Sequence, residues 1–247
     1  MGETTFAATG ETTGKKAGTR DRIVRAAAGL LVEGGREAVT TRAVAAAAGV
    51  QAPTIYRQFG DMRGLLDEVA SFGFSMYLRD KTSRARVEDP VEDLRRGWDL
   101  HVGFGLDNPA FYTLMYGDPR PGVEPTAARE ASEILHGLVR RVAEAGRLRV
   151  GVESAAAMIH AAGSGVTLAL IDTRPEERDP ALSEATREAI LAAVITDAAP
   201  DTAAGHGRVS GRAVALKAAL PEAPAGFTPP ESALLSEWLD RLARHRG

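Results

Sequence analysis

The chain has 247 residues, of which 44% are hydrophobic and only 5% aromatic, and it contains no cysteine. The lack of cysteine excludes disulfides, thiolate zinc sites and cysteine nucleophiles, and it fits a cytoplasmic protein. The sequence indicates no apolar run near the roughly 18 to 20 residues that cross a bilayer. Since it also indicates no secretion signal, we expect no membrane partner.

Basic residues are concentrated near the N-terminus, although the whole chain carries a net charge of -3. Between Lys15 and Arg63 there are nine basic and four acidic residues, so the rest of the chain is acidic. A basic module on an acidic body fits binding of a polyanion at one end only. Chance clustering of surface charge is the alternative explanation.

Apolar residues at helical spacing predict four helices in the first 80 residues. The first covers residues 19–33 and is stopped by Gly34 and Gly35. The second covers residues 42–48 and ends at Gly49, and the third covers residues 53–59. Asp61 is placed to cap the fourth, over residues 61–80.

The second and third of these helices meet the requirements of a helix-turn-helix. Ala45 supplies a small residue where the helices cross closely, and Gly49 suits a left-handed turn. Val44, Val50 and Ile55 recur at the intervals needed to lock the two helices together. The third helix then presents its N-terminal, outward side to the major groove of DNA.

Ten residues in this region are candidates for DNA contacts. Gln is suited to reading adenine, Arg to guanine or phosphate, and hydroxyls at a helix N-terminus to phosphate. Basic residues of the N-terminal arm, Lys15 and Lys16, would add contacts without sequence preference. The ten candidates are Thr40, Thr41, Arg42, Gln51, Ala52, Pro53, Thr54, Tyr56, Arg57 and Arg63.

The rest of the chain also reads as helical, with one exception. One predicted helix begins at Pro90. The others cover residues 110–116, 125–145, 152–171, 182–195 and 230–244. Residues 198–229 are rich in Pro, Gly and Ala and predict a loosely ordered segment, in which residues 212–220 form at most a short helix. No strand-like alternation of useful length occurs, which favours an all-α fold.

The N-terminal pattern resembles the DNA-binding domain of the TetR family of repressors over about 50 residues. The matching positions are Arg22, Ile23, Val24, Ala26, Ala27, Gly34, Gly35, Thr40, Thr41, Arg42, Val44, Ala45, Ala48, Gly49, Val50, Thr54, Ile55, Tyr56, Arg57, Gln58, Phe59, Leu65 and Leu66. Two positions depart from the family. Met62 stands where a phosphate-contacting lysine is usual, and Gln51 stands where serine is frequent.

The resemblance implies an N-terminal three-helix helix-turn-helix domain followed by a larger helical ligand-binding and dimerisation domain. We therefore expect five parts along the chain. They are a flexible basic arm (1–18), the DNA-binding domain (19–65), the helical domain (66–197), the loosely ordered segment (198–229) and a C-terminal helix (230–247).

Two sets of residues in the helical domain are candidates for ligand binding and dimerisation. The densest aromatic cluster, with two histidines, fits the wall of an apolar pocket or ordinary core packing: Trp98, His101, Phe104, Phe111, Tyr112, Met115 and His160. Small residues of an apolar helix fit a dimer interface or a tight crossing within the chain. This set is Ala156, Gly163, Ser164 and Thr167, with His160 of the same helix and Ile190 of the next helix.

These features predict a sequence-specific transcriptional regulator, a repressor that a small-molecule ligand releases from its operator. The expected partners are double-stranded operator DNA, a small apolar or amphipathic ligand and a second copy of the chain. The alternative is a TetR-fold adaptor or sensor with weak or lost operator binding, which Met62, Ala52 and Pro53 keep open. We expect neither an enzyme nor a metal or cofactor site, because no catalytic or metal-ligand spacing occurs.

Overall fold

The computed structural model describes residues 18–81, 87–117, 122, 124–179, 181–196, 206–220 and 226–244. Within these ranges it contains eleven α-helices and one short 3-10 helix. The nearest approach to β-structure there is one isolated bridge between Leu148 and Ile195. The predicted all-α fold is confirmed, while the predicted arm lies outside the described residues apart from Gly18.

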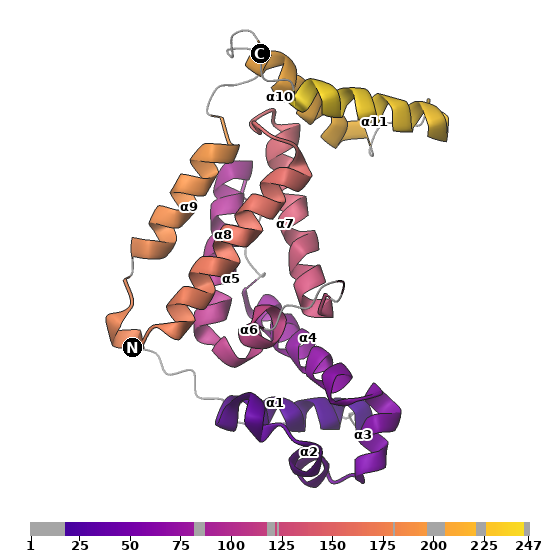
Figure 1. Cartoon of the computed structure of the whole chain (residues 1–247), viewed down its shortest axis with the longest axis vertical. Coiled ribbons are helices and arrows are strands. Elements are labelled where there is room, and N and C mark those ends of the chain that lie inside the picture. Colours follow the sequence, from indigo (N-terminus) through magenta and orange to yellow (C-terminus); the bar gives the residue numbers. More distant parts are fainter. Residues whose placement is uncertain are drawn as a thin grey trace. The chain divides into compact units, whose positions relative to one another are not determined.

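The chain divides into two compact units, and the division falls between Leu65 and Leu66. The N-terminal unit holds three helices and the start of a fourth, whereas the C-terminal unit holds the others (Figure 1). The helices of the N-terminal unit are α1 (Thr19–Ala38), α2 (Thr41–Ala48), α3 (Ala52–Phe59) and the first residues of α4 (Met62–Lys81).

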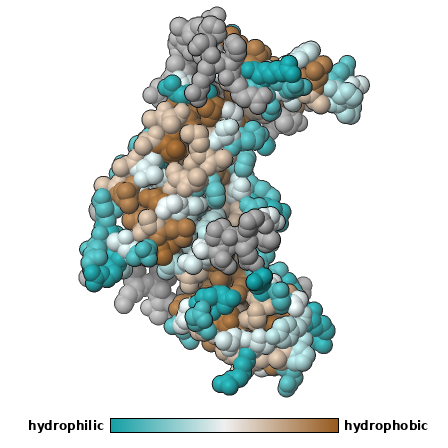
Figure 2. All heavy atoms as spheres, viewed as in Figure 1, coloured by the Kyte–Doolittle hydropathy of each residue, from teal (hydrophilic) through white to brown (hydrophobic). Residues whose placement is uncertain are grey.

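The core of the N-terminal unit is small and made of aliphatic side chains. Each of its larger members contributes about 1.5 to 3 kcal/mol by leaving water. The fully or nearly fully buried residues are Ile23, Val24, Ala27, Ala28, Leu31, Val39, Val44, Ala48, Ile55 and Leu65. Hydrophilic side chains cover much of the visible surface of this unit (Figure 2).

The glycine pair interrupts the first helix, as the sequence predicts. Gly35 adopts non-helical angles (φ 68°, ψ -169°), and a short helical piece follows it, so that α1 runs to Ala38 across a kink.

The C-terminal unit is built around α5, α7 and α8, which all pack against one another. Its helices are the remainder of α4, then α5 (Pro90–Asp107), α6 (Pro109–Tyr116), α7 (Thr126–Glu144), α8 (Val152–Asp172), α9 (Ala181–Val194), α10 (His206–Ala219) and α11 (Pro229–Arg244), with the 3-10 helix at Pro175–Glu177. Leu94, Val139 and Ile159 are among the residues of the common core.

Helix α8 matches the helix predicted over residues 152–171, but it is more apolar over its whole length than the sequence analysis states. Its 21 residues pass the length and hydropathy test for a membrane span, because alanine and glycine replace charged residues along most of the helix. The expectation of no such run is therefore wrong as a statement about composition. However, α8 packs against α5, α7 and α9, which is typical of a core helix.

Helix α10 begins six residues before the short helix expected in the segment 198–229. Val214 and Ala218 of α10 join the core of the C-terminal unit. Two polar contacts tie α10 to α11: Lys217 donates to Asp240 over 2.6 Å, and the Ser210 hydroxyl donates to the Ala243 carbonyl over 2.8 Å. Tertiary packing thus overrides the weak helical preference of a glycine-containing segment.

Candidate nucleic-acid interface and ligand pocket

The turn between α2 and α3 has the geometry that the sequence predicts. Gly49 lies in the left-handed region (φ 63°, ψ 42°), where a residue with a Cβ atom is disfavoured. The Val50 amide donates to the Ala45 carbonyl over 3.0 Å, which closes the end of α2. At its start, the Thr40 hydroxyl accepts a hydrogen bond from the Ala43 amide over 3.2 Å. Both ends of α2 are therefore capped.

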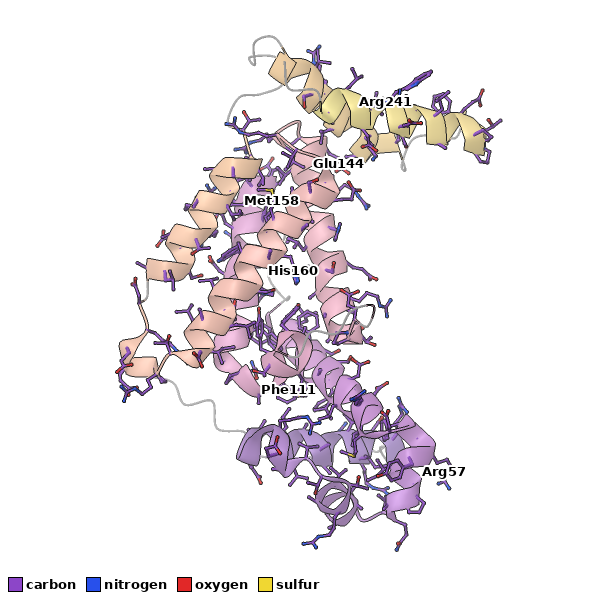
Figure 3. The ribbon with its side chains drawn as sticks, viewed as in Figure 1. Arg57, Phe111, Glu144, Met158, His160 and Arg241 are labelled. Atoms are coloured by element: carbon purple, nitrogen blue, oxygen red, sulfur yellow. The ribbon has the colours of Figure 1, made fainter. Side chains whose placement is uncertain are left out.

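Helix α3 buries one side chain and leaves an outward surface. Ile55 is fully buried, whereas the neighbouring Tyr56 is 47% exposed. Arg57 is exposed as well and lies on α3 in Figure 3. The Tyr56 and Thr41 hydroxyls lie 3.1 Å apart in a hydrogen bond that joins α2 to α3. This contact places two predicted DNA-binding hydroxyls on the same exposed surface.

The ten predicted DNA-binding residues all lie in the N-terminal unit. Seven of them are exposed, namely Thr40, Arg42, Gln51, Pro53, Tyr56, Arg57 and Arg63. Thr41, Ala52 and Thr54 are half-buried, as is Met62. The arrangement provides hydroxyls, an amide and guanidinium groups in one outward set, which is the chemistry that base edges and phosphates accept.

Arg20 supports the end of α3, a role that the sequence analysis missed. Its guanidinium donates to the Gln58 carbonyl over 2.5 Å and lies 4.5 Å from the centre of the Phe59 ring. Since the two partners are 38 and 39 positions away in the chain, nothing in the local pattern around Arg20 signals this contact.

The start of α4 packs tightly against the end of α3. As predicted, Asp61 caps α4, because its carboxylate accepts a hydrogen bond from the Gly64 amide over 2.8 Å. A Cβ atom at position 64 would lie 2.2 Å from the Phe59 carbonyl oxygen. Only glycine therefore fits at this junction without a shift of the backbone.

The C-terminal unit contains a mostly apolar pocket between α4, α5, α6, α7 and α8. Together with the open solvent at its mouth, the space measures about 700 Å³. It is lined by Phe74, Tyr77, Leu78, Leu94, Gly97, Trp98, Leu100, His101, Phe104, Tyr116, Ala131, Ile134, Leu135, Leu138, Ile159, His160 and Gly163. Hydrophobic atoms also gather on the visible surface of this unit (Figure 2).

Two histidines and two tyrosines form a polar cluster at this pocket. The Tyr112 hydroxyl and His101 Nε2 are 2.7 Å apart in a hydrogen bond. The Tyr116 ring lies between the imidazoles, with its centre 5.7 Å from that of His101 and 5.5 Å from that of His160. Burial, reinforced by His160, lowers the pKa of His101 to about 4, so this imidazole is neutral at pH 7.

Four of the seven predicted ligand-binding residues line this pocket: Trp98, His101, Phe104 and His160. The other three do not. Phe111 is buried against α4, where a Cβ atom on Gly73 would lie 2.4 Å from its ring; Tyr112 and Met115 are buried too. Figure 3 labels Phe111 on α6 and His160 on α8. Adjacent aromatics on a helix point in different directions, so the cluster divides between core and pocket.

The sequence analysis missed the contribution of α4 and α7 to the pocket. Phe74, Tyr77 and Leu78 come from α4, and Ile134, Leu135 and Leu138 come from α7. The two helices are also joined directly. The Asp67 carboxylate of α4 accepts hydrogen bonds from the Thr126 amide over 3.0 Å and from its hydroxyl over 3.1 Å, and so caps α7.

Three predicted interface residues are buried inside the chain and cannot meet a partner. Ala156 and Thr167 are at most 1% exposed. A Cβ atom on Gly163 would lie 3.5 Å from the Trp98 ring. Ser164 and Ile190 are half-buried, and His160 lines the pocket. Because small residues surround α8 on every side, periodicity alone does not distinguish its inner face from its outer one.

The two units together define an all-helical protein with an N-terminal helix-turn-helix, and known proteins share both features. Residues 23–69 match the family model described as bacterial regulatory proteins of the tetR family. An HTH-type transcriptional regulator of Mycobacterium bovis is 34% identical over 92 residues, which cover 34% of this chain and 49% of the relative. The chain thus spans about half the length of the curated relatives that it matches.

Solved structures share the fold. A tetR family transcription regulator from Shewanella sp. PV-4 has a TM-score of 0.55 at 19% identity, covering 72% of this chain and 98% of that one. The fatty acid degradation regulator FadR from Bacillus halodurans has a TM-score of 0.52 at 19% identity, covering 72% and 95%. The N-terminal unit of this chain is thus similar to the tetR family of bacterial regulatory proteins, whose family model its residues 23–69 match.

Proposed function

We propose that this chain is a cytoplasmic transcriptional regulator that binds operator DNA as a homodimer and is released by a small molecule. The observation that carries the proposal is the Thr41–Tyr56 contact, which holds α2 and α3 so that Tyr56 and Arg57 share one outward surface.

The ligand part of the proposal rests on α4. This helix begins in the N-terminal unit with Met62, and three of its later residues line the pocket of the C-terminal unit. A ligand that contacts Phe74, Tyr77 or Leu78 therefore touches the same helix that leaves the DNA-binding domain. The ligand would release the protein from DNA if it bound more tightly to a position of α4 that does not suit DNA binding than to the position that does.

The dimer part of the proposal rests on an exposed apolar surface of α8 and α9. Small and apolar residues repeat on α8 about one turn apart and continue on α9, where Leu182 is 40% exposed. The exposed set is Ala157, Met158, Ala161, Gly165 and Ala169 of α8, with Leu182, Ala185, Ala189 and Ala192 of α9. Pairing of this surface in two copies would give the two DNA-binding domains that a symmetric operator requires.

The proposal is tested by titrating DNA from the chain's own upstream region and following fluorescence anisotropy. The double change Tyr56→Ala and Arg57→Ala is expected to weaken binding by about 100-fold, since contacts to base edges and phosphates are lost. Arg25→Ala removes an equal charge from the exposed surface of α1. This control is expected to change the affinity by about threefold or less.

One result would oppose the proposed DNA-binding function, and another would oppose the assignment of Tyr56 and Arg57 to the groove. If the parent protein binds no upstream sequence better than random competitor at low salt, the adaptor or sensor is favoured. If the double variant is no longer dimeric by light scattering, its loss of binding does not report on groove contacts.

A further inference from the structure

The pocket of the C-terminal unit is bordered by uncharged side chains. Among the described residues that line it, none is Asp, Glu, Lys or Arg, and the only polar types are His and Tyr. His101 is neutral at pH 7, and partial burial likewise lowers the pKa of His160, which Glu124 raises and His136 lowers to smaller extents. A ligand carboxylate or phosphate would therefore meet no cation on these walls.

Three of the hydrogen-bonding side chains in the lining already have partners, and one of them is Tyr77, whose hydroxyl donates to the Leu100 carbonyl over 3.2 Å. His101 Nε2 already bonds the Tyr112 hydroxyl, and the Trp98 indole donates to the Ser183 hydroxyl over 3.1 Å. The Tyr116 hydroxyl, in contrast, is buried and has no hydrogen-bond partner in the part of the chain that the structure describes. A buried donor of this kind stabilises a ligand that offers an acceptor and disfavours one that does not.

Charge near Tyr116 adds a second constraint. Burial, then Tyr112, then Glu124 raise the pKa of the Tyr116 phenol, so it stays protonated and able to donate. Glu124 acts on His160 as well as on Tyr116, so its negative charge is near both residues. An anionic ligand group would be repelled there.

Most of the pocket lining is hydrocarbon. Phe74 and Leu78 of α4, Leu94 of α5 and Leu138 of α7 provide apolar walls, where only a matching apolar body gains by leaving water. Ile134 is 44% exposed and also lines the pocket, so the apolar walls extend to solvent.

We propose that this pocket selects an uncharged, mostly apolar molecule with one hydroxyl or carbonyl oxygen, and that the Tyr116 hydroxyl donates a hydrogen bond to that oxygen. The inference rests on the proposed function in taking this pocket as the effector site. It goes further by naming the ligand class and the residue that recognises the polar group.

Three probes of similar size test the ligand class: 4-hexylphenol, hexylbenzene and 4-hexylbenzoate. The chain has two tryptophans, so a Trp238→Phe background leaves Trp98, which lines the pocket, as the reporter of binding. We expect 4-hexylphenol to bind about tenfold tighter than hexylbenzene and at least about tenfold tighter than 4-hexylbenzoate, consistent with one hydrogen bond and with an unpaired charge. Equal or tighter binding of the benzoate, or no binding of the phenol, overturns the proposal.

The role of Tyr116 is tested by Tyr116→Phe, which keeps the ring and removes only the unpartnered hydroxyl. This variant is expected to bind 4-hexylphenol and hexylbenzene with affinities within about twofold of each other. Its melting temperature is expected to equal or exceed that of the parent. Tyr56→Phe makes the same chemical change in the N-terminal unit and is expected to keep the tenfold preference. A preference that survives in Tyr116→Phe overturns the role of this hydroxyl.

Failure of this inference is distinguishable from failure of the proposed function. Probe binding is measured on the free protein, whereas release is measured on the operator complex by anisotropy. Selective binding of 4-hexylphenol without release of DNA supports the ligand class and opposes the effector role. Release by 4-hexylbenzoate but not by 4-hexylphenol supports the effector role and overturns the ligand class.

Discussion

His101 shows how burial sets the chemistry of a single residue. Its imidazole is enclosed in the C-terminal unit and shares a hydrogen bond with the Tyr112 hydroxyl through Nε2. The folded-state pKa of about 4 lies below the ordinary value of 6.5. Between these values the unfolded chain binds a proton that the folded chain does not. Stability conferred by the neutral imidazole is therefore complete above pH 6.5 and falls as the pH drops towards 4.

Because the pKa of His101 is lowered in the folded chain, we expect the free energy of unfolding to fall by about 1 kcal/mol between pH 7.5 and pH 5.5. His101→Gln keeps an acceptor for Tyr112 without a titrating ring, so it should lose most of this dependence; His160, whose pKa is also lowered, supplies the remainder. Urea unfolding at the two pH values measures the effect. If His101→Gln loses as much unfolding free energy as the parent between the two pH values, a buried neutral imidazole at position 101 is contradicted.

At the scale of helices, the junction between α3 and α4 fixes how the recognition helix ends. Asp61 caps α4, and Gly64 allows the new helix to approach the Phe59 carbonyl. Arg20 contacts the last residues of α3 from α1. These contacts hold the C-terminal end of α3, a helix that contributes only Ile55 to the buried core.

Gly64→Ala is expected to lower the free energy of unfolding by about 1 to 3 kcal/mol, because the new methyl group meets backbone rather than a flexible side chain. Gly29 of α1 is the matched control, since a Cβ atom there meets nothing within 4 Å. Gly29→Ala is expected to raise stability by about 0.5 to 1 kcal/mol. Thermal unfolding by circular dichroism compares the two, and equal effects would contradict the tight junction.

The elements of the N-terminal unit were predictable because their signals are local. Thr40 and Asp61 cap helices, and Gly49 forms the turn, within a few residues of the positions that they serve. The extension of α1 beyond Gly35 and the full length of α10 were not predictable in this way. The helical turns after Gly35 and the packing of Val214 into a distant core are not visible in a local pattern.

The pocket was predicted only in part for a similar reason. Aromatic residues of α5 stand out in the sequence, and Trp98, His101 and Phe104 do line the pocket. Leu135 and Leu138 belong to an amphipathic stripe that fits any core helix, so their position in a pocket wall depends on the tertiary fold. Tyr116 differs from its buried neighbour Tyr112 only in direction, which sequence spacing does not resolve.

At the scale of the whole molecule, α8 has one buried face and one exposed face. One face, with Ala156 and Thr167, is buried in the C-terminal unit. The opposite face carries Ala161 and Gly165 in the open, where small residues permit a second helix to approach closely. The proposed dimer uses this outer face, so a large charged side chain placed on it would separate the copies without disturbing the core.

Gly165→Arg is expected to convert the dimer to a monomer at micromolar concentration, because an arginine in the middle of an apolar interface is desolvated without a partner. Gly137→Arg on α7 is the matched control: both glycines are exposed and helical, and a Cβ atom at either meets nothing within 4 Å. Light scattering is expected to give a monomer for Gly165→Arg and a dimer for Gly137→Arg. The melting temperatures of the two variants as monomers are expected to be similar. Operator affinity should fall with the dimer, since one copy reads only one of two half-sites about 34 Å apart. A dimer that persists in Gly165→Arg would place the interface elsewhere than on α8.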